Sequence, residues 1–196
     1  MNIRTKYWVV SLVYFVSVPA YGRDVLLEFK AAYFLPTNDT FKDIYGGGAI
    51  YGPEVTGQLY KRLYGFTSVN FFNNHGKSIG LCNPTTVKLV TLGLGLKYLI
   101  PSIYGTWYIG LGIVPTRLHT HDYSPFVAPF STRWTCGGVT KAGVYIDLRH
   151  SLFLDLFFDY SFARVKPKCV SGIQVEQHAA YPNGCSFGAG LGYRFN

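Results

Sequence analysis

The last stretch of the chain sets the strongest limit on what the chain can fold into. From Phe187 to Phe195 every odd-numbered residue is apolar, whereas the even-numbered residues are three glycines and Arg194. A period of two indicates a β-strand with one apolar face and one small or charged face. The apolar face ends in two aromatic residues, Tyr193 and Phe195. A strand in a membrane barrel needs such a face, with aromatic rings where lipid meets water.

The same alternation recurs along the chain and predicts eight strands. We expect them at 25–35, 49–60, 63–73, 87–99, 106–114, 133–148, 152–165 and 187–196. Short turns alternate with long loops, which we expect at 36–48, 74–86, 115–132 and 166–184. Strands of about ten residues cross a bilayer when tilted by roughly 45°. Short turns at one end and long loops at the other are typical of bacterial outer-membrane barrels.

Composition leaves two classes of protein open. Aromatic residues make up 17% of the chain and charged residues only 14%, whereas ordinary soluble domains have about 25% charged residues. Beyond the N-terminus no apolar run is long enough for a transmembrane helix. The chain is therefore a membrane barrel or a soluble lipocalin-type barrel, which would turn its apolar face inward. We favour the membrane barrel, because the apolar faces hold more large residues than a soluble eight-stranded core can take.

The face opposite the apolar one collects charges of both signs, which predicts an ionic network in the barrel lumen. Its members are Glu28, Lys30, Glu54, Lys97, Lys141, Asp147, Asp155, Asp159 and Arg194. Inward glycines make room for the long basic side chains. We expect the basic side chains of Lys97, Lys141 and Arg194 to face the carboxylates of Asp147, Asp155 or Asp159. Such charges plug the interior of an eight-stranded barrel; a conducting pore is the alternative.

The N-terminal 22 residues have the pattern of a cleavable secretory signal peptide. A basic start precedes an apolar stretch, and small residues Ala20 and Gly22 precede the expected cleavage before Arg23. Cleavage after Ala20 and an uncleaved anchor helix are the alternatives. Residues 23–196 then form one barrel domain. Removal of 1–22 lowers the formal net charge from +8 to +6. Anionic lipid head groups are better counterparts than nucleic acid for a basic exported protein.

Four cysteines in an exported chain suggest disulfides. Cys169 and Cys185 bracket the fourth loop, and Cys82 and Cys136 could join the second loop to the outer end of the sixth strand. The sequence leaves all three pairings open, and cross-linking between molecules of the cell envelope is the alternative. The cysteines lack the spacing of a zinc site.

One cluster could suggest catalysis. His119, His121 and Ser124 lie together in the expected third loop, where a base, a hydroxyl and an orienting acid could converge. Nothing in the sequence fixes them in place, so we expect a polar loop and no catalytic residue. Two histidines in alternate positions lack a third ligand. No metal and no cofactor are expected.

The chain resembles the small outer-membrane β-barrel proteins of the OmpA, OmpX and OmpW type. The resemblance rests on the signal peptide, the eight strands and the closing stretch 190–195, and it is one of pattern over the whole mature chain. It implies a bacterial outer-membrane location in contact with outer-membrane lipids and lipopolysaccharide. It also implies that the barrel assembly machinery recognises the closing strand through Leu191, Tyr193 and Phe195, although Asn196 follows the terminal aromatic here.

These observations predict an all-β, eight-stranded, antiparallel, up-and-down transmembrane barrel. We expect a structural or surface-interaction role through the long loops, with an unidentified host-surface or envelope partner and without enzymatic activity. Proteins of this type also include narrow channels and lipid-modifying enzymes. A channel for small or apolar solutes, an enzyme acting on lipid A acyl chains and a soluble secreted binding barrel therefore stay open, because fold alone does not choose among them.

Overall fold

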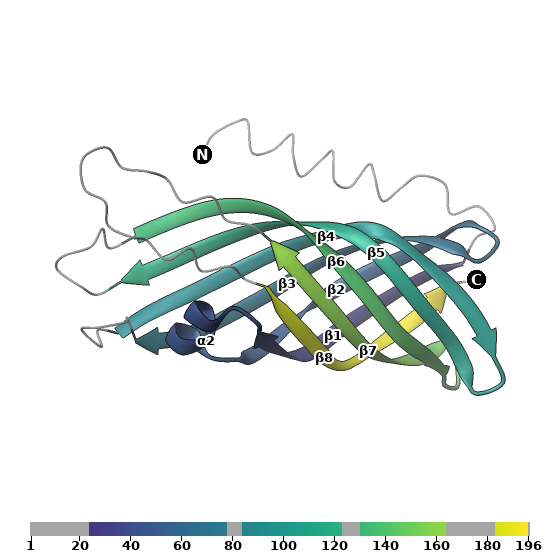
Figure 1. Ribbon diagram of the computed structural model, residues 1–196. Coiled ribbons are helices and arrows are strands. Elements are labelled where there is room, and N and C mark those ends of the chain that lie inside the picture. The colour runs from purple at the N-terminus through teal and green to yellow at the C-terminus, as the bar shows by residue number, and fades with distance from the viewer. Residues whose placement is uncertain (1–23, 78–83, 123–129, 164–182, 196) are drawn as a thin grey trace, which may run out of the picture.

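The computed structural model describes residues 24–77, 84–122, 130–163 and 183–195, and these form one closed antiparallel barrel (Figure 1). Each strand pairs with its neighbour in sequence, and β8 closes the barrel against β1. The strands are β1 (Val25–Pro36), β2 (Gly48–Tyr60), β3 (Leu63–Lys77), β4 (Pro84–Ser102), β5 (Gly105–Asp122), β6 (Phe130–Asp147), β7 (Leu152–Ala163) and β8 (Gly184–Phe195). The predicted fold class is confirmed.

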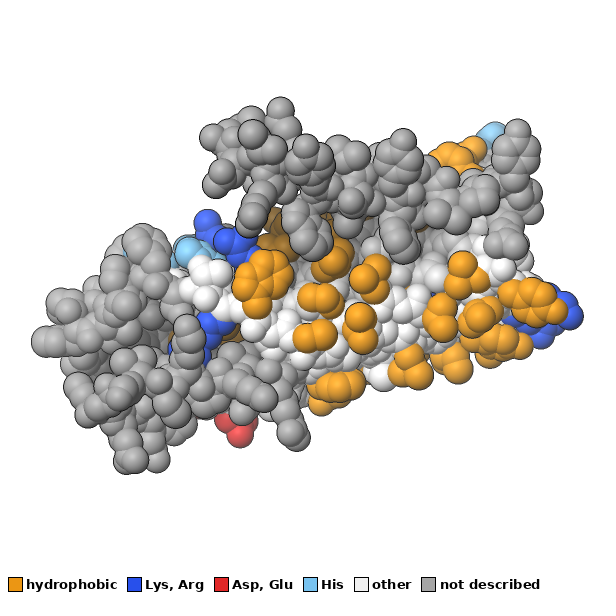
Figure 2. Space-filling model, turned by 90° about the horizontal axis from the view of Figure 1, so that it is seen from above, with side chains coloured by type: hydrophobic (Ala, Val, Ile, Leu, Met, Phe, Trp, Pro, Cys, Tyr) orange, Lys and Arg blue, Asp and Glu red, His pale blue; other side chains and the backbone are white. Residues whose placement is uncertain are grey.

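Apolar and charged side chains lie on opposite sides of the barrel wall. In β1, Leu27 and Phe29 are about half exposed on the outside, whereas Glu28 and Lys30 are buried inside. Figure 2 shows the resulting band of apolar side chains on the outer surface. A soluble barrel has the reverse arrangement, whereas a barrel in lipid turns apolar side chains outward and polar ones inward.

Four strands extend beyond the rest of the wall. β3, β4, β5 and β6 have 15 to 19 residues, whereas the other strands have 12 or 13. The prediction of a loop over 115–132 is wrong at both ends, because β5 continues to Asp122 and β6 begins at Phe130. Thr116 and Leu118 continue the buried, inward face of β5. The sequence predicts a loop there because the outward residues that follow Pro115 are polar, so that the apolar outer face of the strand ends at this point.

A short helix, α2 (Asp39–Tyr45), occupies the first predicted loop. Asn38 caps its N-terminus, because the side-chain oxygen accepts a hydrogen bond of 3.0 Å from the Phe41 N–H. Gly46 ends it with a φ of 65° and donates its N–H to the Lys42 carbonyl. Phe41 and Tyr45 are buried at the outer mouth of the barrel. Among the described residues no helix is long and apolar enough to span a membrane.

Two predictions depend on segments that are not described. The predicted signal peptide, residues 1–22, lies outside the described residues and stays a prediction. The same holds for disulfides that involve Cys82 or Cys169. Cys136 on β6 and Cys185 on β8 lie two strands apart and do not bond to each other.

Candidate functional site

The lumen is filled in layers from the end with the short turns to the outer mouth. An aromatic layer lies at the short-turn end and contains Leu26, Tyr64, Leu99, Tyr108, Tyr145, Phe153 and Phe157. An ionic cluster lies next to it and a small cavity follows. A second aromatic layer, which we call the cap, closes the mouth with Phe34, Phe41, Tyr45, Phe72, Val87, Leu89 and Leu118.

Seven charged residues from five strands form the ionic cluster. They are Glu28, Lys30, Glu54, Lys97, Lys141, Asp155 and Asp159. All seven were predicted to face the lumen. Four carboxyl groups thus meet three ammonium groups, and six of the seven side chains are at most 4% exposed.

Glu54 is the centre of the ionic cluster. Its carboxylate lies 3.2 Å from Lys30 Nζ and 3.0 Å from Lys141 Nζ, and it also accepts a hydrogen bond from Lys97. Lys30 and Lys141 each have a further partner on β7. Lys30 Nζ lies 2.9 Å from the carboxylate of Asp155, and Lys141 Nζ lies 2.6 Å from the carboxylate of Asp159. Each lysine therefore has at least two carboxylate partners, and removal of a lysine leaves the buried carboxyl groups with fewer ammonium groups.

Two tyrosines complete the ionic cluster, and the sequence analysis did not single them out. The Tyr108 hydroxyl donates to Asp155 at 3.0 Å, and Lys97 donates to the Tyr145 hydroxyl at 2.6 Å. The two rings stack with centroids 4.7 Å apart, and the Lys97 ammonium lies 4.4 Å from the Tyr108 centroid. The available signal was their place on the inward face, in register with the predicted charges.

Glycines on the inward face let the lysine side chains lie against the wall. A Cβ at Gly190 would lie 3.1 Å from the Cγ atom of Lys30, and one at Gly110 would lie 3.1 Å from the Cγ atom of Lys97. Such contacts are tighter than ordinary packing. The alternation of glycine and apolar residues in β5 and β8 therefore positions the basic groups as well as the strands.

The remaining two predicted lumen charges form a separate pair. Arg194 lies 3.2 Å from Asp147 at the short-turn end, where the Asp147 side chain is 56% exposed. Lys97 does not face an aspartate as predicted, because its carboxylate partners are Glu54 and Glu28. Alternation fixes the side of the wall on which a residue lies, whereas partners depend on the height that the strand stagger gives each residue.

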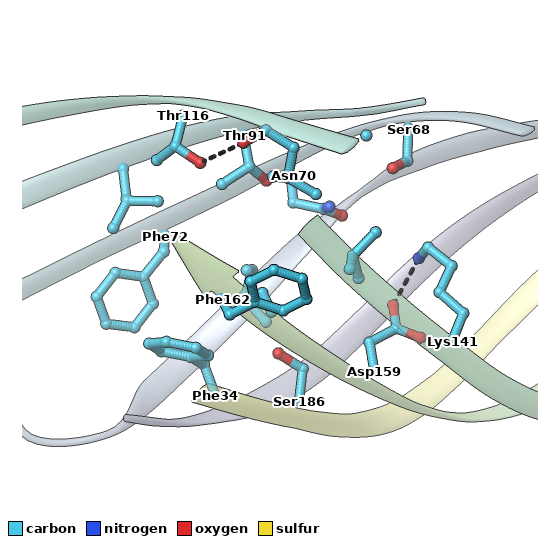
Figure 3. A pocket seen from close by; sticks show the side chains of 16 residues that line it. Phe34, Ser68, Asn70, Phe72, Thr91, Thr116, Lys141, Asp159, Phe162 and Ser186 are labelled. Carbon is cyan, nitrogen blue, oxygen red and sulfur yellow. Dashed lines mark hydrogen bonds and ion pairs between the residues drawn. The ribbon is translucent and has the colours of Figure 1, made fainter. Parts of the chain in front are cut away.

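A cavity of about 60 Å³ lies between the ionic cluster and the cap (Figure 3). Lys141 and Asp159 line its inner end, and Phe34 and Phe72 of the cap line its outer end. Its polar wall includes the Ser68 hydroxyl, which has no hydrogen-bond partner among the described residues. A cavity of this size holds a few water molecules.

The histidines do not face the lumen. His119 and His121 lie on the outer face of β5, and His119 Nδ1 is 2.8 Å from the Thr132 hydroxyl of β6. Their predicted place in a loop is therefore wrong, and Ser124 lies outside the described residues. Among the residues that the structure describes, no group of three or more His, Cys, Asp and Glu side chains could hold a metal ion.

The predicted assembly residues lie on the lipid-facing side of the closing strand. Leu191, Tyr193 and Phe195 of β8 are about half exposed, and the rings of Tyr193 and Phe195 contact each other edge to face. Their recognition by an assembly machinery stays a prediction.

Comparisons with known proteins agree on the fold. No protein-family model matches the sequence, and no curated protein matches it. Among solved structures, the outer membrane protein OprG from Pseudomonas aeruginosa aligns with a TM-score of 0.63 and 13% identity, over 89% of this chain and 96% of that chain. Neisserial surface protein A (NspA) aligns with a TM-score of 0.59 and 13% identity, over 88% and 97%.

A third solved structure is Ail, the attachment invasion locus protein of Yersinia pestis, in complex with the heparin analogue sucrose octasulfate. It aligns with a TM-score of 0.55 and 12% identity, over 88% of this chain and 99% of that chain. At these sequence identities the structural likeness shows the fold alone. With its apolar exterior and charged interior, the chain has the fold of the small eight-stranded outer-membrane β-barrel proteins, which agrees with the expected location in a bacterial outer membrane.

Proposed function

We propose that this protein is an outer-membrane barrel that holds surface-interaction segments at the cell exterior, without conducting solutes and without catalysing a reaction. The observation that carries the proposal is the filled lumen. The aromatic layer, the ionic cluster and the cap occupy successive levels inside one closed wall. A wall with an apolar exterior and a filled interior serves to fix its loops in a membrane.

The outer end of the barrel carries the proposed interaction role. There the wall is extended on β3 to β6, and α2 presents exposed Lys42 and Asp43 beside the mouth. The described likeness to a surface protein and to an attachment protein supports this role. A host-surface or envelope partner would contact this end. Export by the signal peptide and insertion through the closing strand supply the route to the membrane.

Cell fractionation followed by unheated gel electrophoresis tests the membrane placement. We expect the protein in the outer-membrane fraction, with a mobility that changes when the sample is heated, because a closed barrel stays folded in detergent. A protein that is released without detergent and runs at one mobility would contradict the proposal. In planar bilayers we expect no conductance steps.

A narrow channel is the second candidate, and the cavity inside the lumen favours it. Ser68 points into that cavity, whereas the preceding residue, Thr67, lies on the outer face of β3. If the barrel conducts, Ser68→Phe should abolish the conductance steps and Thr67→Phe should leave them unchanged. Conductance that both variants retain would place the pathway outside the lumen.

The lipid-modifying alternative is tested separately. His121→Ala should leave the acylation pattern of lipid A unchanged, as mass spectrometry of extracted lipid would report. A changed pattern would favour the enzyme over the surface role.

A further inference from the structure

Basic side chains on the outward faces of the described strands gather near the outer end of the barrel. Within the described strands, every Lys, Arg and His that faces outward lies on β3, β4 or β5, near the outer end. We call this set the basic patch; it comprises His75, Lys77, Lys88, Arg117, His119 and His121. The described Asp and Glu side chains of the strands all face inward. Figure 2 shows Lys, Arg and His side chains beside the left end of the apolar band, and further Lys and Arg side chains at the right end, where the short turns lie.

Strand register brings the members of the basic patch together. Lys88 lies between Asn73 and His119 in one row across the strands. The next row toward the membrane holds Val90 and Arg117. Lys88 and Arg117 are thus diagonal neighbours on adjacent strands, about 7–8 Å apart, so that both long side chains can reach one phosphate group.

An aromatic residue borders the basic patch at the height of the lipid surface. Trp134 of β6 is the register partner of Arg117, and its ring lies 5.8 Å from the guanidinium carbon. Its side chain is 71% exposed. Trp at the edge of an apolar band marks the boundary between lipid tails and head groups. Outward residues in the following rows are apolar, with Leu94 opposite Ile113.

We propose that the basic patch binds the phosphorylated head group of an outer-leaflet glycolipid, whose acyl chains lie along β4 and β5. Lys88 and Arg117 contact the phosphate and His119 lies beside them. The patch points sideways from the wall and continues directly into the apolar band. A lipid meets both surfaces at once, whereas a soluble polyanion would approach the outer mouth along the barrel axis. This inference rests on the proposed membrane placement.

The test uses the protein purified from membranes and reconstituted in phosphatidylcholine nanodiscs. Native mass spectrometry would measure binding of bisphosphorylated lipid A and of dephosphorylated lipid A. We expect a preference for the phosphorylated form that falls roughly 30-fold in the double variant Lys88→Gln/Arg117→Gln, because two cations near the lipid surface are removed. The matched control, Lys61→Gln/Arg62→Gln, removes two cations from the short turn between β2 and β3 and should keep the preference.

Each other outcome overturns the inference in a distinct way. Equal loss in the control variant would mean that net charge, and not the patch, attracts the lipid. An unchanged preference in the patch variant would place the lipid elsewhere. Displacement of lipid A by a sulfated sugar would assign the patch to a soluble polyanion. Because heat-dependent mobility is measured on every variant, a failed lipid site is distinguishable from a protein that does not insert.

Discussion

The contact between Lys97 and Glu54 provides the sharpest test of how the ionic cluster stabilises the barrel. Lys97 is fully buried and contacts Glu54, Glu28 and the Tyr145 hydroxyl. Lys97→Met keeps much of the side-chain volume and removes the ammonium group. Four carboxyl groups then face two ammonium groups, and we expect the free energy of unfolding to fall by about 3–5 kcal/mol.

The partner substitution should cost less. After Glu54→Gln, Lys30 still has Asp155 at 2.9 Å and Lys141 still has Asp159 at 2.6 Å. The ionic cluster then has three carboxyl groups and three ammonium groups. We expect a loss of about 1.5–3 kcal/mol, the range for hydrogen bonds to charged groups. In the double variant Lys97→Met/Glu54→Gln the cluster again has one carboxyl group in excess, as in the natural protein.

The double variant therefore decides the question. Its destabilisation should be smaller than the sum of the two single losses by about 0.5–3 kcal/mol, because each substitution removes a partner that the other leaves unpaired. Urea unfolding in lipid vesicles, followed by the mobility of unheated samples, measures all four proteins. Lys61→Met, on the exposed turn, should stay within about 0.5 kcal/mol of the natural protein. Strict additivity would refute the argument that Lys97 and Glu54 compensate each other.

Three further predictions concern single side chains. Tyr108→Phe removes a hydroxyl that donates to buried Asp155 and should lower the free energy of unfolding in urea by about 1.5–3 kcal/mol; an unchanged value would mean that water replaces the hydroxyl. Gly52→Ala would place a Cβ against a backbone carbonyl of β3 and should destabilise the barrel by about 1–3 kcal/mol, whereas Gly57→Ala meets open space in the same strand and serves as its control. Phe41→Ala should release α2 from the mouth, so that limited proteolysis cuts near the helix while heat-dependent mobility stays unchanged, because few contacts tie α2 to the wall.

Alternation predicted the side of the wall on which each residue lies. Glu28 and Lys30 are predicted to face the lumen on period alone, and both residues are buried. The period is a local property of a strand, so it is readable without knowing the neighbours. The same holds for the number of strands, because turn signals separate the alternating segments.

The position of each side chain along the barrel axis, and hence its interaction partners, could not be predicted from the sequence. Lys30 was predicted to face the lumen, but its approach to Asp155, 125 positions later, depends on how all the intervening strands are staggered. The sequence predicts a loop over 36–48 and not the helix α2, because proline at 36 and glycines at 46–48 are typical of loops. Its apolar Phe41 and Tyr45, four residues apart, were the available signal.

The origin of the ionic cluster in five different strands has a consequence for assembly. Its three closest pairs link β2 with β4, β6 with β7 and β1 with β7. The pair between β1 and β7 is absent from a sheet that has not yet closed, which leaves the Lys30 ammonium in water. The desolvation of that ammonium and the arrival of Asp155 occur in the same event, when β8 meets β1. We expect this coupling to make barrel closure a single late step, in which a partly closed intermediate is penalised by uncompensated charge.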